Sequence, residues 1–331
     1  MNTRKLKVGI IAGGQSSEHE ISCISAGGVL AAIDRNRFEP VLIGITKKGE
    51  WVLPAANQVL AIHEGVLPEI LAGESKHFEE LVKDLDLIFP ILHGPFGEDG
   101  TIQGLCEMFG VKYVGSGVLA SAVAMDKSFA KPIFAAHGLH VAPGITVKAN
   151  SPIDTSHLTF PLFVKPARGG SSRGTTKVKE ASAISSAVSQ ALAYDSKVLI
   201  ESGIIGREIE CAVLEIDGVA TASPLGEIKI VGDHEFYDFD AKYLDGSTQL
   251  VYPDDLPAEI YLGIQRSAVD AFNALGCKGL ARVDFFYADG KIVINEINTM
   301  PGFTATSVFP KLWGKAGVGY TELISRLIDS V

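Results

Sequence analysis

Runs of apolar residues alternate with amphipathic stretches along the first part of the chain, and this alternation predicts an open parallel α/β sheet. Leu6–Ala12, Phe38–Ile45 and Asp86–Leu92 have the composition of buried strands, and Ile21–Ile33 has the spacing of a helix. The first and third of these strands each run into a glycine-rich turn. Open α/β sheets bind ligands beyond the carboxyl ends of their strands, so both turns are candidate binding loops.

The composition of the chain shifts after Ala142-Pro143-Gly144, and from there the pattern predicts strands separated by single helices. The predicted strands are Phe160–Val164, Lys197–Glu201, Arg207–Glu215 and Gly226–Val231, and the predicted helices are Ala181–Ala193, Pro257–Leu275 and Thr321–Asp329. Residues 236–243 mix aromatic and charged side chains without a period, which is typical of a long ordered loop.

Two strand-like runs toward the C-terminal end flank Ala288-Asp289-Gly290, and this pattern predicts a β-hairpin. The two runs are Arg282–Tyr287 and Lys291–Ile297. A three-residue loop with Gly290 left-handed places Arg282 opposite Glu296, with Asp284 diagonal to Glu296. A two-residue loop instead turns Asp284 to the face away from Glu296. We favour the three-residue loop.

On that register Asp284, Glu296 and Asn298 project from one face of an otherwise apolar hairpin, beside Arg282. Two carboxylates and an amide oxygen suit Mg²⁺, which takes few protein oxygens and completes its shell with phosphate and water. For the hairpin considered alone, a solvated face with a capping asparagine is the alternative interpretation. Phosphate-binding features elsewhere in the chain therefore decide between the two.

Such features occur in the candidate loops. The segment from Lys165 to Gly174 carries three glycines, two serines and two arginines, a composition suited to wrapping phosphoryl oxygens, with a flexible linker as the alternative. Glu18, in the first glycine-rich turn, could complement a helix dipole or face the cation of a ligand. His93 begins the turn after the third strand and suits a structural role as well as a ligand contact.

Length and charge limit the class of protein. A chain of 331 residues predicts two or three domains, and a net charge of −10 argues against nucleic acid or an anionic membrane surface as a partner. An acidic protein that handles phosphates must therefore gather its basic groups locally or recruit metal. The four cysteines are scattered without a CxxC pair, so neither a disulfide framework nor a zinc site is indicated. The apolar run Val8–Ala12 is too short for a signal peptide, and a cytoplasmic location is expected.

Two short motifs offer other functions. Gly115–Ala120 matches the dinucleotide fingerprint G-x-G-x-x-[GA], which makes a nicotinamide-dependent dehydrogenase an alternative. The match follows the predicted fourth strand, Val111–Val114, and no acid occurs between Lys127 and Asp154, where the fingerprint needs one. Ser128–Lys131 fits the S-x-x-K of acyl-serine enzymes without its companion motifs, which indicates a chance match.

Several separated motifs together resemble the D-alanine–D-alanine ligases of the ATP-grasp superfamily, over nearly the full length of the chain. The motifs are Gly13-Gly14-x-Ser16-x-Glu18-x-Glu20, His93-Gly94-x-x-Gly97-Glu98-Asp99-Gly100, Met125-Asp126-Lys127, Gly170-Ser171-Ser172, Ala241-Lys242-Tyr243, Arg282-Val283-Asp284 and Asn295-Glu296-Ile297-Asn298-Thr299-Met300-Pro301-Gly302. Each motif is modest alone, and their order along one chain makes the resemblance specific.

The resemblance implies a three-domain ATP-grasp architecture, with an N-terminal open parallel α/β domain at 1–122, a central lid domain at 123–205 and a C-terminal domain at 206–331. ATP is expected between the second and third domains. The nucleotide residues implied are Lys127, Lys165 and Lys242 at the phosphates, Glu201, Ser202, Gly203 and Ile204 at adenine, and Glu208 at the ribose. The implied metal ligands are Asp284, Glu296 and Asn298, holding two Mg²⁺ ions for which Mn²⁺ can substitute.

The resemblance also implies roles at the amino-acid site. Glu18 pairs with the ammonium group of the first amino acid, and His93 lies near the carboxylate of that amino acid. Gly302 and Ser307 meet the second substrate, and Arg282 stabilises an oxyanion. Glu18, Ser171 and Tyr243 form a triad that ties the site to its lid. The implied reaction is ATP-dependent ligation of two D-alanines through D-alanyl phosphate, for peptidoglycan. Another ATP-grasp carboxylate–amine ligase, or one that makes D-alanyl–D-lactate, is the alternative; Tyr243 favours the dipeptide because ester-forming members tend to lack it. Expected partners are D-alanine, ATP and a second copy in a homodimer.

Overall fold

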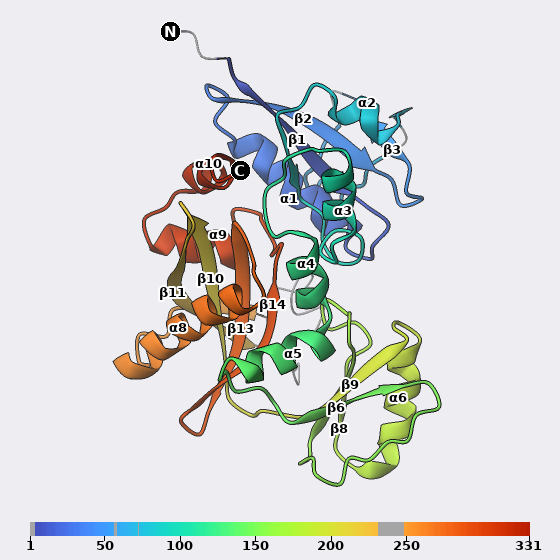
Figure 1. The fold of residues 1–331 in the computed structure, drawn as a ribbon, viewed down its shortest axis with the longest axis vertical. Coiled ribbons are helices and arrows are strands. Elements are labelled where there is room, and N and C mark those ends of the chain that lie inside the picture. Colours follow the sequence, from blue (N-terminus) through green and yellow to red (C-terminus); the bar gives the residue numbers. More distant parts are fainter. Residues whose placement is uncertain (1–3, 56–57, 72, 231–247) are drawn as a thin grey trace.

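The computed structural model describes residues 4–55, 58–71, 73–230 and 248–331, and three β-sheets organise these residues (Figure 1). The N-terminal sheet has the order β4-β3-β2-β1-β5. Its strands are β1 (Leu6–Gly13), β2 (Phe38–Ile45), β3 (Trp51–Leu53), β4 (Glu74–Ser75) and β5 (Leu87–Pro90), and the helices between them are α1 (His19–Ala32) and α2 (Phe78–Val82). β1 pairs in parallel with β2 and β5, so the open parallel sheet predicted from the buried apolar runs is confirmed.

The central sheet is antiparallel and has the order β6-β9-β7-β8. Its elements are β6 (Gly144–Lys148), β7 (Leu162–Pro166), β8 (Thr176–Val178), η1 (Ala181–Ala183), α6 (Ile184–Leu192) and β9 (Lys197–Ser202). One apolar core lies between this sheet and α6, because Ala187, Val188 and Ala191 of the helix are buried against the strands. The turn between β7 and β8 is the glycine- and serine-rich segment that the composition singled out.

The C-terminal sheet is also antiparallel, with the order β12-β11-β10-β13-β14. Its strands are β10 (Arg207–Ile216), β11 (Val219–Ile230), β12 (Thr248–Val251), β13 (Leu280–Ala288) and β14 (Lys291–Asn298). The helices are α3 (Thr101–Met108), α4 (Val118–Met125) and α5 (Lys127–Ala136) before the central sheet, and α8 (Ala258–Ala274), α9 (Val308–Lys315) and α10 (Tyr320–Asp329) around the C-terminal one. α8, α4 and α5 share one core with this sheet.

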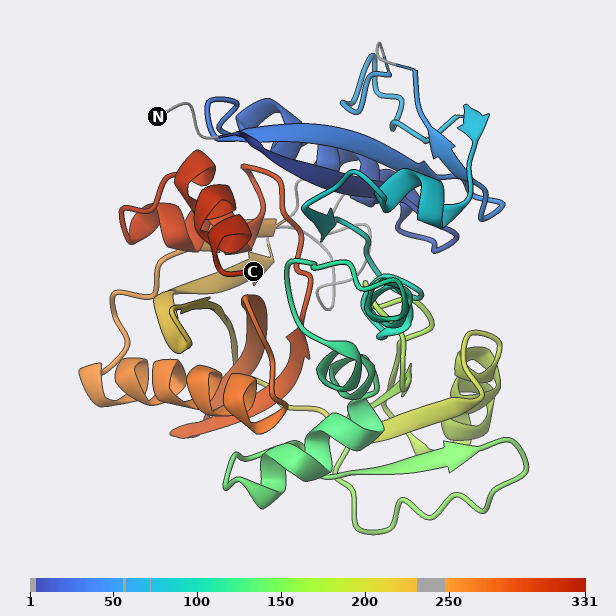
Figure 2. The ribbon, with the colours of Figure 1, turned by 45° about the horizontal axis from the view of Figure 1, so that its top comes forward.

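The N-terminal sheet and the C-terminal helices share a second core. Phe89 of β5 packs edge-on against Phe303, with ring centroids 5.6 Å apart, and Phe309, Leu323 and Leu327 of α9 and α10 belong to the same buried cluster. Figure 2 shows these two helices (red) beneath the N-terminal sheet (blue). Segments from opposite ends of the chain therefore complete one core.

Several elements, among them α3, α9, β6 and β8, were not predicted from the sequence, and three further segments differ from the fold. Val111–Val114 forms no extended strand and contributes only the bridge between Tyr113 and Ile88. α5 was not predicted, since Pro132 lies inside it and the segment was interpreted only as a chance motif. β11 begins at Val219, seven residues before the predicted Gly226, and pairs along β10. Among the described residues, no helix is long and apolar enough to cross a membrane.

Candidate active site

The β13–β14 hairpin has a different loop from the predicted one. Ala288 pairs with Lys291, so the loop is the two residues Asp289 and Gly290, both left-handed (φ 49° and 74°). The predicted three-residue loop, with Arg282 opposite Glu296, is therefore wrong. A two-residue loop alone would have turned the polar groups to opposite faces.

A β-bulge restores the shared face. The register shifts after the Phe285–Ile294 pair, so Asn295 is extra and Asp284 lies directly opposite Glu296. The next polar pair along the hairpin is Arg282 with Asn298. The prediction that these four polar side chains share one face is confirmed, although a bulge in β14 and not a three-residue loop produces the arrangement.

Asp284 is held by its neighbours on this face. Arg282 donates from Nε and Nη2 to the two Asp284 carboxylate oxygens, at 2.7 Å each, and Asn298 Nδ2 donates to Asp284 Oδ2 at 3.1 Å. Arg282 also pairs with Glu210 of β10, at 3.1 Å between Nε and Oε2. The orientation of the Asp284 carboxylate is thus fixed by bonds from two directions.

Glu296 links the hairpin, through a lysine, to the glycine- and serine-rich loop between β7 and β8. Its Oε2 is 2.8 Å from Lys127 Nζ, and Lys127 Nζ also donates to the carbonyl oxygen of Gly169 at 2.9 Å. Although burial opposes it, the negative charge of Glu296 raises the pKa of Lys127. The ammonium group at the start of α5 therefore stays charged between the two sheets.

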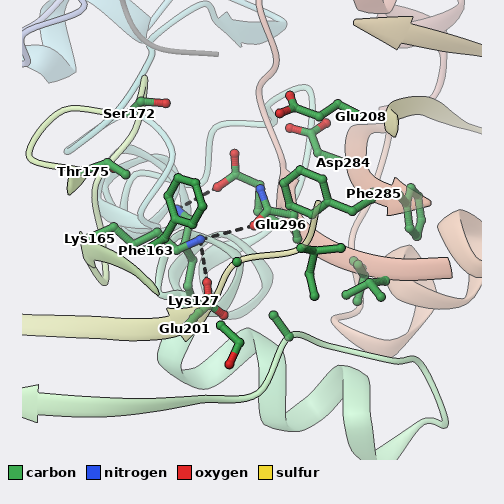
Figure 3. A pocket seen from close by; sticks show the side chains of 18 of the residues that line it. Lys127, Phe163, Lys165, Ser172, Thr175, Glu201, Glu208, Asp284, Phe285 and Glu296 are labelled. Atoms are coloured by element: carbon green, nitrogen blue, oxygen red, sulfur yellow. Dashed lines mark hydrogen bonds and ion pairs between the residues drawn. The ribbon is translucent and has the colours of Figure 1, made fainter. Parts of the chain in front are cut away.

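A second lysine cluster lies beside the first. Lys165 of β7 contacts Glu201 Oε2 at 2.7 Å and donates to Asn295 Oδ1, the bulge residue, at 3.2 Å. The other Glu201 oxygen contacts Lys131 of α5. Lys131 was missed by the sequence prediction, although its spacing of four from Lys127 indicates one helix face. Figure 3 shows Lys127, Lys165 and Glu201 converging at the base of the cavity.

These residues line a cavity of about 340 Å³ between the central and C-terminal sheets. Its basic lining residues are Lys127, Lys131, Lys165, Arg173 and Lys177. Phe163 and Phe285 contribute rings, and Ser172 and Thr175 of the loop lie across the cavity from Glu208 and Asp284 (Figure 3). Glu201, Ser202, Gly203, Ile204 and Glu208, predicted at the adenine and ribose, all line it. Basic groups do gather at this cavity, as expected for an acidic protein, but an equal number of carboxylates lines it: Glu201, Glu208, Glu210, Asp284 and Glu296.

A second cavity, of about 470 Å³, adjoins the first toward the N-terminal sheet. The residues that line both cavities are Lys127, Gly169, Gly170, Ser171 and Glu296. The second cavity alone is lined by the predicted residues Glu18, His93, Arg282, Asn298, Gly302 and Ser307. Because the two cavities meet at Lys127 and Glu296, groups bound in each would approach one another there.

The loop between β7 and β8 contacts the start of α1 through Ser171. Its hydroxyl donates to Glu18 Oε1, and both Ser171 and Ser172 adopt left-handed backbone, with φ of 48° and 56°. A non-glycine residue with such a φ is costly, and two in succession turn the hydroxyl of Ser171 toward Glu18. Two members of the predicted triad, Glu18 and Ser171, are therefore in contact. The third, Tyr243, lies outside the described residues, as do Lys242 and the whole predicted loop 236–243.

His93 is buried and fully engaged by the protein. Its Nδ1 lies 3.1 Å from the carbonyl oxygen of Met300, which fixes the proton on Nδ1, and its Nε2 lies 3.0 Å from Ser25 Oγ, which donates to it. Burial lowers the pKa of His93, so the ring is neutral. The neutral ring therefore lines the second cavity and anchors the Met300 backbone, and its contact with the first carboxylate stays a prediction.

Glu98 is a largely enclosed acid, with its side chain 14% exposed, for which the sequence suggested no role. It accepts a hydrogen bond from the backbone N–H of Gly94 at 2.8 Å. Burial, together with the nearby charge of Glu18, raises the pKa of Glu98 to about 8. The site thus holds a carboxyl group that keeps its proton at neutral pH.

The glycine-rich segment 115–120 serves packing. A Cβ atom on Gly279 would lie 3.3 Å from the Gly115 backbone, and Ser116 Oγ accepts a hydrogen bond from the Lys278 backbone N–H at 3.1 Å. Gly115 itself faces Met300 and Leu280 side chains. Lys278 and Gly279 therefore occupy the space beside Gly115 and Ser116, which favours a packing role for this turn over a dinucleotide site.

The donor set on the hairpin fits Mg²⁺. No group of three or more His, Cys, Asp or Glu side chains able to hold a metal occurs in the described part of the chain, and the hairpin offers two carboxylates and one amide. Like charges directly opposite one another on neighbouring strands repel, so Asp284 and Glu296 form a stable pair only with cations close by. A hard ion that completes its shell with phosphate oxygens suits this pair and the adjoining cavity.

Enzymes that hold ATP between two antiparallel sheets in this way form the ATP-grasp class, and the fold and the cavity place the chain in that class. The comparisons with known proteins agree. The Bacillus anthracis D-alanine–D-alanine ligase, whose structure was determined with ATP, superposes with a TM-score of 0.78 at 30% identity, covering 98% of this chain and 97% of that one. The VanG D-Ala:D-Ser ligase of Enterococcus faecalis superposes with a TM-score of 0.82 at 35% identity, over 98% and 99%.

The sequence comparisons narrow the class to a family. The model for the D-ala D-ala ligase N-terminus matches residues 7–116, and the model for the D-ala D-ala ligase C-terminus matches residues 134–329. The D-alanine–D-alanine ligase of Rhodococcus jostii is 46% identical, covering 100% of this chain and 98% of the relative. The chain belongs to the D-alanine–D-alanine ligase family, and it is an ATP-dependent ligase that uses Mg²⁺.

Proposed function

We propose that the two adjoining cavities join two D-alanine molecules, with ATP in the cavity between the central and C-terminal sheets and the amino acids in the cavity beneath the N-terminal sheet. The observation that carries this proposal is the shared lining at Lys127, Ser171 and Glu296. The γ-phosphoryl group of ATP and the carboxylate of the first D-alanine meet at that boundary. The product is the D-alanyl–D-alanine used in peptidoglycan.

The nucleotide is held by residues with separate tasks. Lys127 and Lys165 bind the phosphates, and the segment 201–204 with Glu208 binds the nucleoside, since all of these line the same cavity. Phe163 and Phe285 offer apolar contact to the base. Asp284, Glu296 and Asn298 are the ligands of Mg²⁺, which, when bound, neutralises charge on the phosphates.

The first substrate is oriented by Glu18. Its carboxylate lies in the second cavity and takes the ammonium group, while the hydroxyl of Ser171 holds Glu18 in place. The carboxylate of D-alanine is a poor acyl donor, because an oxide-like oxygen leaves badly. Transfer of the γ-phosphoryl group of ATP to that carboxylate breaks the bond to ADP and forms D-alanyl phosphate, a far better donor. Positioning and charge neutralisation by the two lysines are the main requirements of this step.

The second D-alanine attacks the acyl phosphate with its neutral amine, and phosphate leaves as the peptide bond forms. Gly302 and Ser307 line the cavity where this amino acid binds. Arg282 and the backbone N–H of Gly302 stabilise the oxyanion, a contribution of about 3 kcal/mol for one such donor. The loop from Gly169 to Gly174 excludes water, which would otherwise hydrolyse the acyl phosphate.

Product analysis tests the assignment. Purified protein with ATP, Mg²⁺ and D-alanine is expected to release ADP and phosphate in step with D-alanyl–D-alanine. ADP release that is independent of the amino acid would reject the proposal. A panel with D-lactate and D-serine as second substrates separates the alternatives, because a preference for D-lactate near neutral pH would identify an ester-forming ligase.

Three organisational features are part of the proposal. The domains are 1–122, 123–205 and 206–331, supported by one sheet in each, although the first boundary falls within α4. The active form is a homodimer. Met108 and Leu119, which are exposed on the adjacent helices α3 and α4, offer an apolar surface for the second copy. Light scattering tests this by comparing the molar mass of the wild type with that of Leu119→Arg. The location is the cytoplasm, where ATP is available, and cell fractionation tests that.

A further inference from the structure

The carboxylate of Glu201 lies between two lysines in the wall of the nucleotide cavity. Its Oε2 is 2.7 Å from Lys165 Nζ, while its Oε1 contacts Lys131 Nζ from the opposite side. Glu201 is 3% exposed and Lys131 is 6% exposed, so water contributes little to the solvation of either charge. Two cations therefore share one buried anion.

The net charge of Lys131, Lys165 and Glu201 determines how strongly this wall of the cavity attracts the phosphates of the nucleotide. An isolated pair of Lys165 with Glu201 has no net charge, and it would present only a dipole to a triphosphate. A second ammonium group on the far oxygen of Glu201 gives the three side chains a net positive charge. Coulomb interactions are strong in a site that excludes water, so this one charge changes the potential felt by the phosphates.

We propose that Lys131 is a positioning residue for ATP: by binding Glu201 on the side away from Lys165, it offsets the Glu201 charge and leaves Lys165 free to act as a cation toward the phosphates. The proposal rests on the proposed function, which places the phosphates at Lys165. Lys131 acts through Glu201, and it stands one helical turn after Lys127, which takes the neighbouring carboxylate Glu296.

Energetics argue against a purely structural role for Lys131. Burying a charged group costs several kcal/mol, and apolar residues of similar size commonly stabilise a core as well as a buried ion pair does. The end of the Lys131 side chain lies at the cavity wall, where a methionine would pack without that cost. Its ammonium group is therefore explained by what it does for Glu201.

The protonation of Lys131 gives the proposal a pH signature. Burial lowers the pKa of Lys131 to about 8, with Lys165 of β7 and Lys127 of α5 acting in the same direction and Glu201 of β9 opposing. Although burial opposes it, the two lysines hold the pKa of Glu201 below its usual range, so Glu201 stays ionised. Above pH 8 Lys131 loses its proton, the pair of Glu201 with Lys165 becomes neutral, and nucleotide affinity falls.

Equilibrium binding of ADP, measured by titration calorimetry without turnover, tests the proposal. We expect Lys131→Met to weaken ADP binding at pH 7 about tenfold and Lys131→Arg to retain it. Because Glu201 also lines the nucleoside part of the cavity, the double variant Lys131→Met/Glu201→Gln is compared with Glu201→Gln alone. Lys131→Met should weaken ADP binding far less in the Glu201→Gln background than in the wild type. Lys148→Met, which removes an exposed charge from β6, is the matched control and should bind as the wild type does.

Either of two results with the variants would overturn the proposal: unchanged ADP affinity in Lys131→Met, or an equally large loss when Lys131→Met is added to Glu201→Gln. If Lys131→Met fails to fold, the wild type still decides, because its ADP affinity must fall between pH 7 and pH 9, and a flat profile rejects the proposal. KM for D-alanine should stay within about twofold, since the positioning concerns the nucleotide. Absence of ADP binding by the wild type would instead reject the proposed function itself.

Discussion

Replacement of Glu296 by glutamine tests the metal assignment most directly. The change keeps the size of the side chain and removes one of the two carboxylates that face each other across the hairpin. Without that charge the site has only Asp284, which is already shared with Arg282. We expect turnover to fall by at least ~10³-fold, equivalent to ~4 kcal/mol of transition-state stabilisation.

The same change should leave the protein folded. The side chains of Lys127 and Glu296 are 10% and 19% exposed, and breaking a buried pair of this kind costs up to ~3–5 kcal/mol. Two effects reduce that cost here: Lys127 keeps its hydrogen bond to Gly169, and the repulsion between Glu296 and Asp284 disappears. A loss of about 1–3 kcal/mol in the free energy of unfolding remains, which a domain of this size tolerates.

A Mg²⁺ titration of phosphate release, with a thermal unfolding curve for each variant, provides the assay. Asp289→Asn is the matched control, because it removes the same charge from the exposed turn of the same hairpin. Glu296→Gln should be inactive at every Mg²⁺ concentration, while Asp289→Asn should follow the wild type. Near-normal activity in Glu296→Gln, or equal losses in both variants, would refute the reasoning.

Three further predictions concern Ser171 in the loop between β7 and β8, the largely enclosed acid Glu98, and Asp126 at the start of α5. Ser171→Ala removes the hydroxyl bond to Glu18 and should raise KM for D-alanine about tenfold, as expected for a hydrogen bond to a charged group; an unchanged KM contradicts the role of the loop. Because burial raises the pKa of Glu98 to about 8, the folded state holds a proton that the unfolded state has lost above pH ~4.3, so this group's contribution to stability is full at low pH and falls as pH rises toward 8. Glu98→Gln should therefore gain stability relative to the wild type across that window, by at most ~1.4 kcal/mol per pH unit, and parallel unfolding curves at pH 5 and pH 8 would count against the buried proton. Asp126→Ala loses the cap to the Ser128 N–H and the pair with Lys197, and urea unfolding should show a loss of about 1–3 kcal/mol; a loss below ~0.5 kcal/mol would mean that the cap is idle.

The sequence predicts the strands well because their patterns are local. Phe38–Ile45 and Lys197–Glu201 are strands within one residue of the expected bounds, since a buried run between turn residues has few other structures open to it. The β13–β14 hairpin shows a feature that local sequence patterns do not predict. Its polar face was predicted correctly from a wrong loop, because the bulge at Asn295 leaves no distinctive mark in the sequence.

The lysine cluster was beyond local reasoning for a different reason. Lys131, Lys165 and Glu201 come from α5, β7 and β9, and they meet only because the central sheet folds back onto the helix. The motif matches located Lys165 and Glu201 but treated Lys131 as chance. The residue assignments at the metal and the substrates remain predictions, to be decided by the variants above.

The core shared by the N-terminal sheet with α9 and α10 bears on how the protein is made. β1 and β5 leave the ribosome early, yet Phe309, Leu323 and Leu327, which cover them, are synthesised much later. Until then the N-terminal sheet exposes an apolar face, and chaperones and proteases can bind such an incompletely folded chain. Folding of this chain therefore finishes only after translation has supplied its closing helices, and a fragment ending before them should be recovered as aggregate.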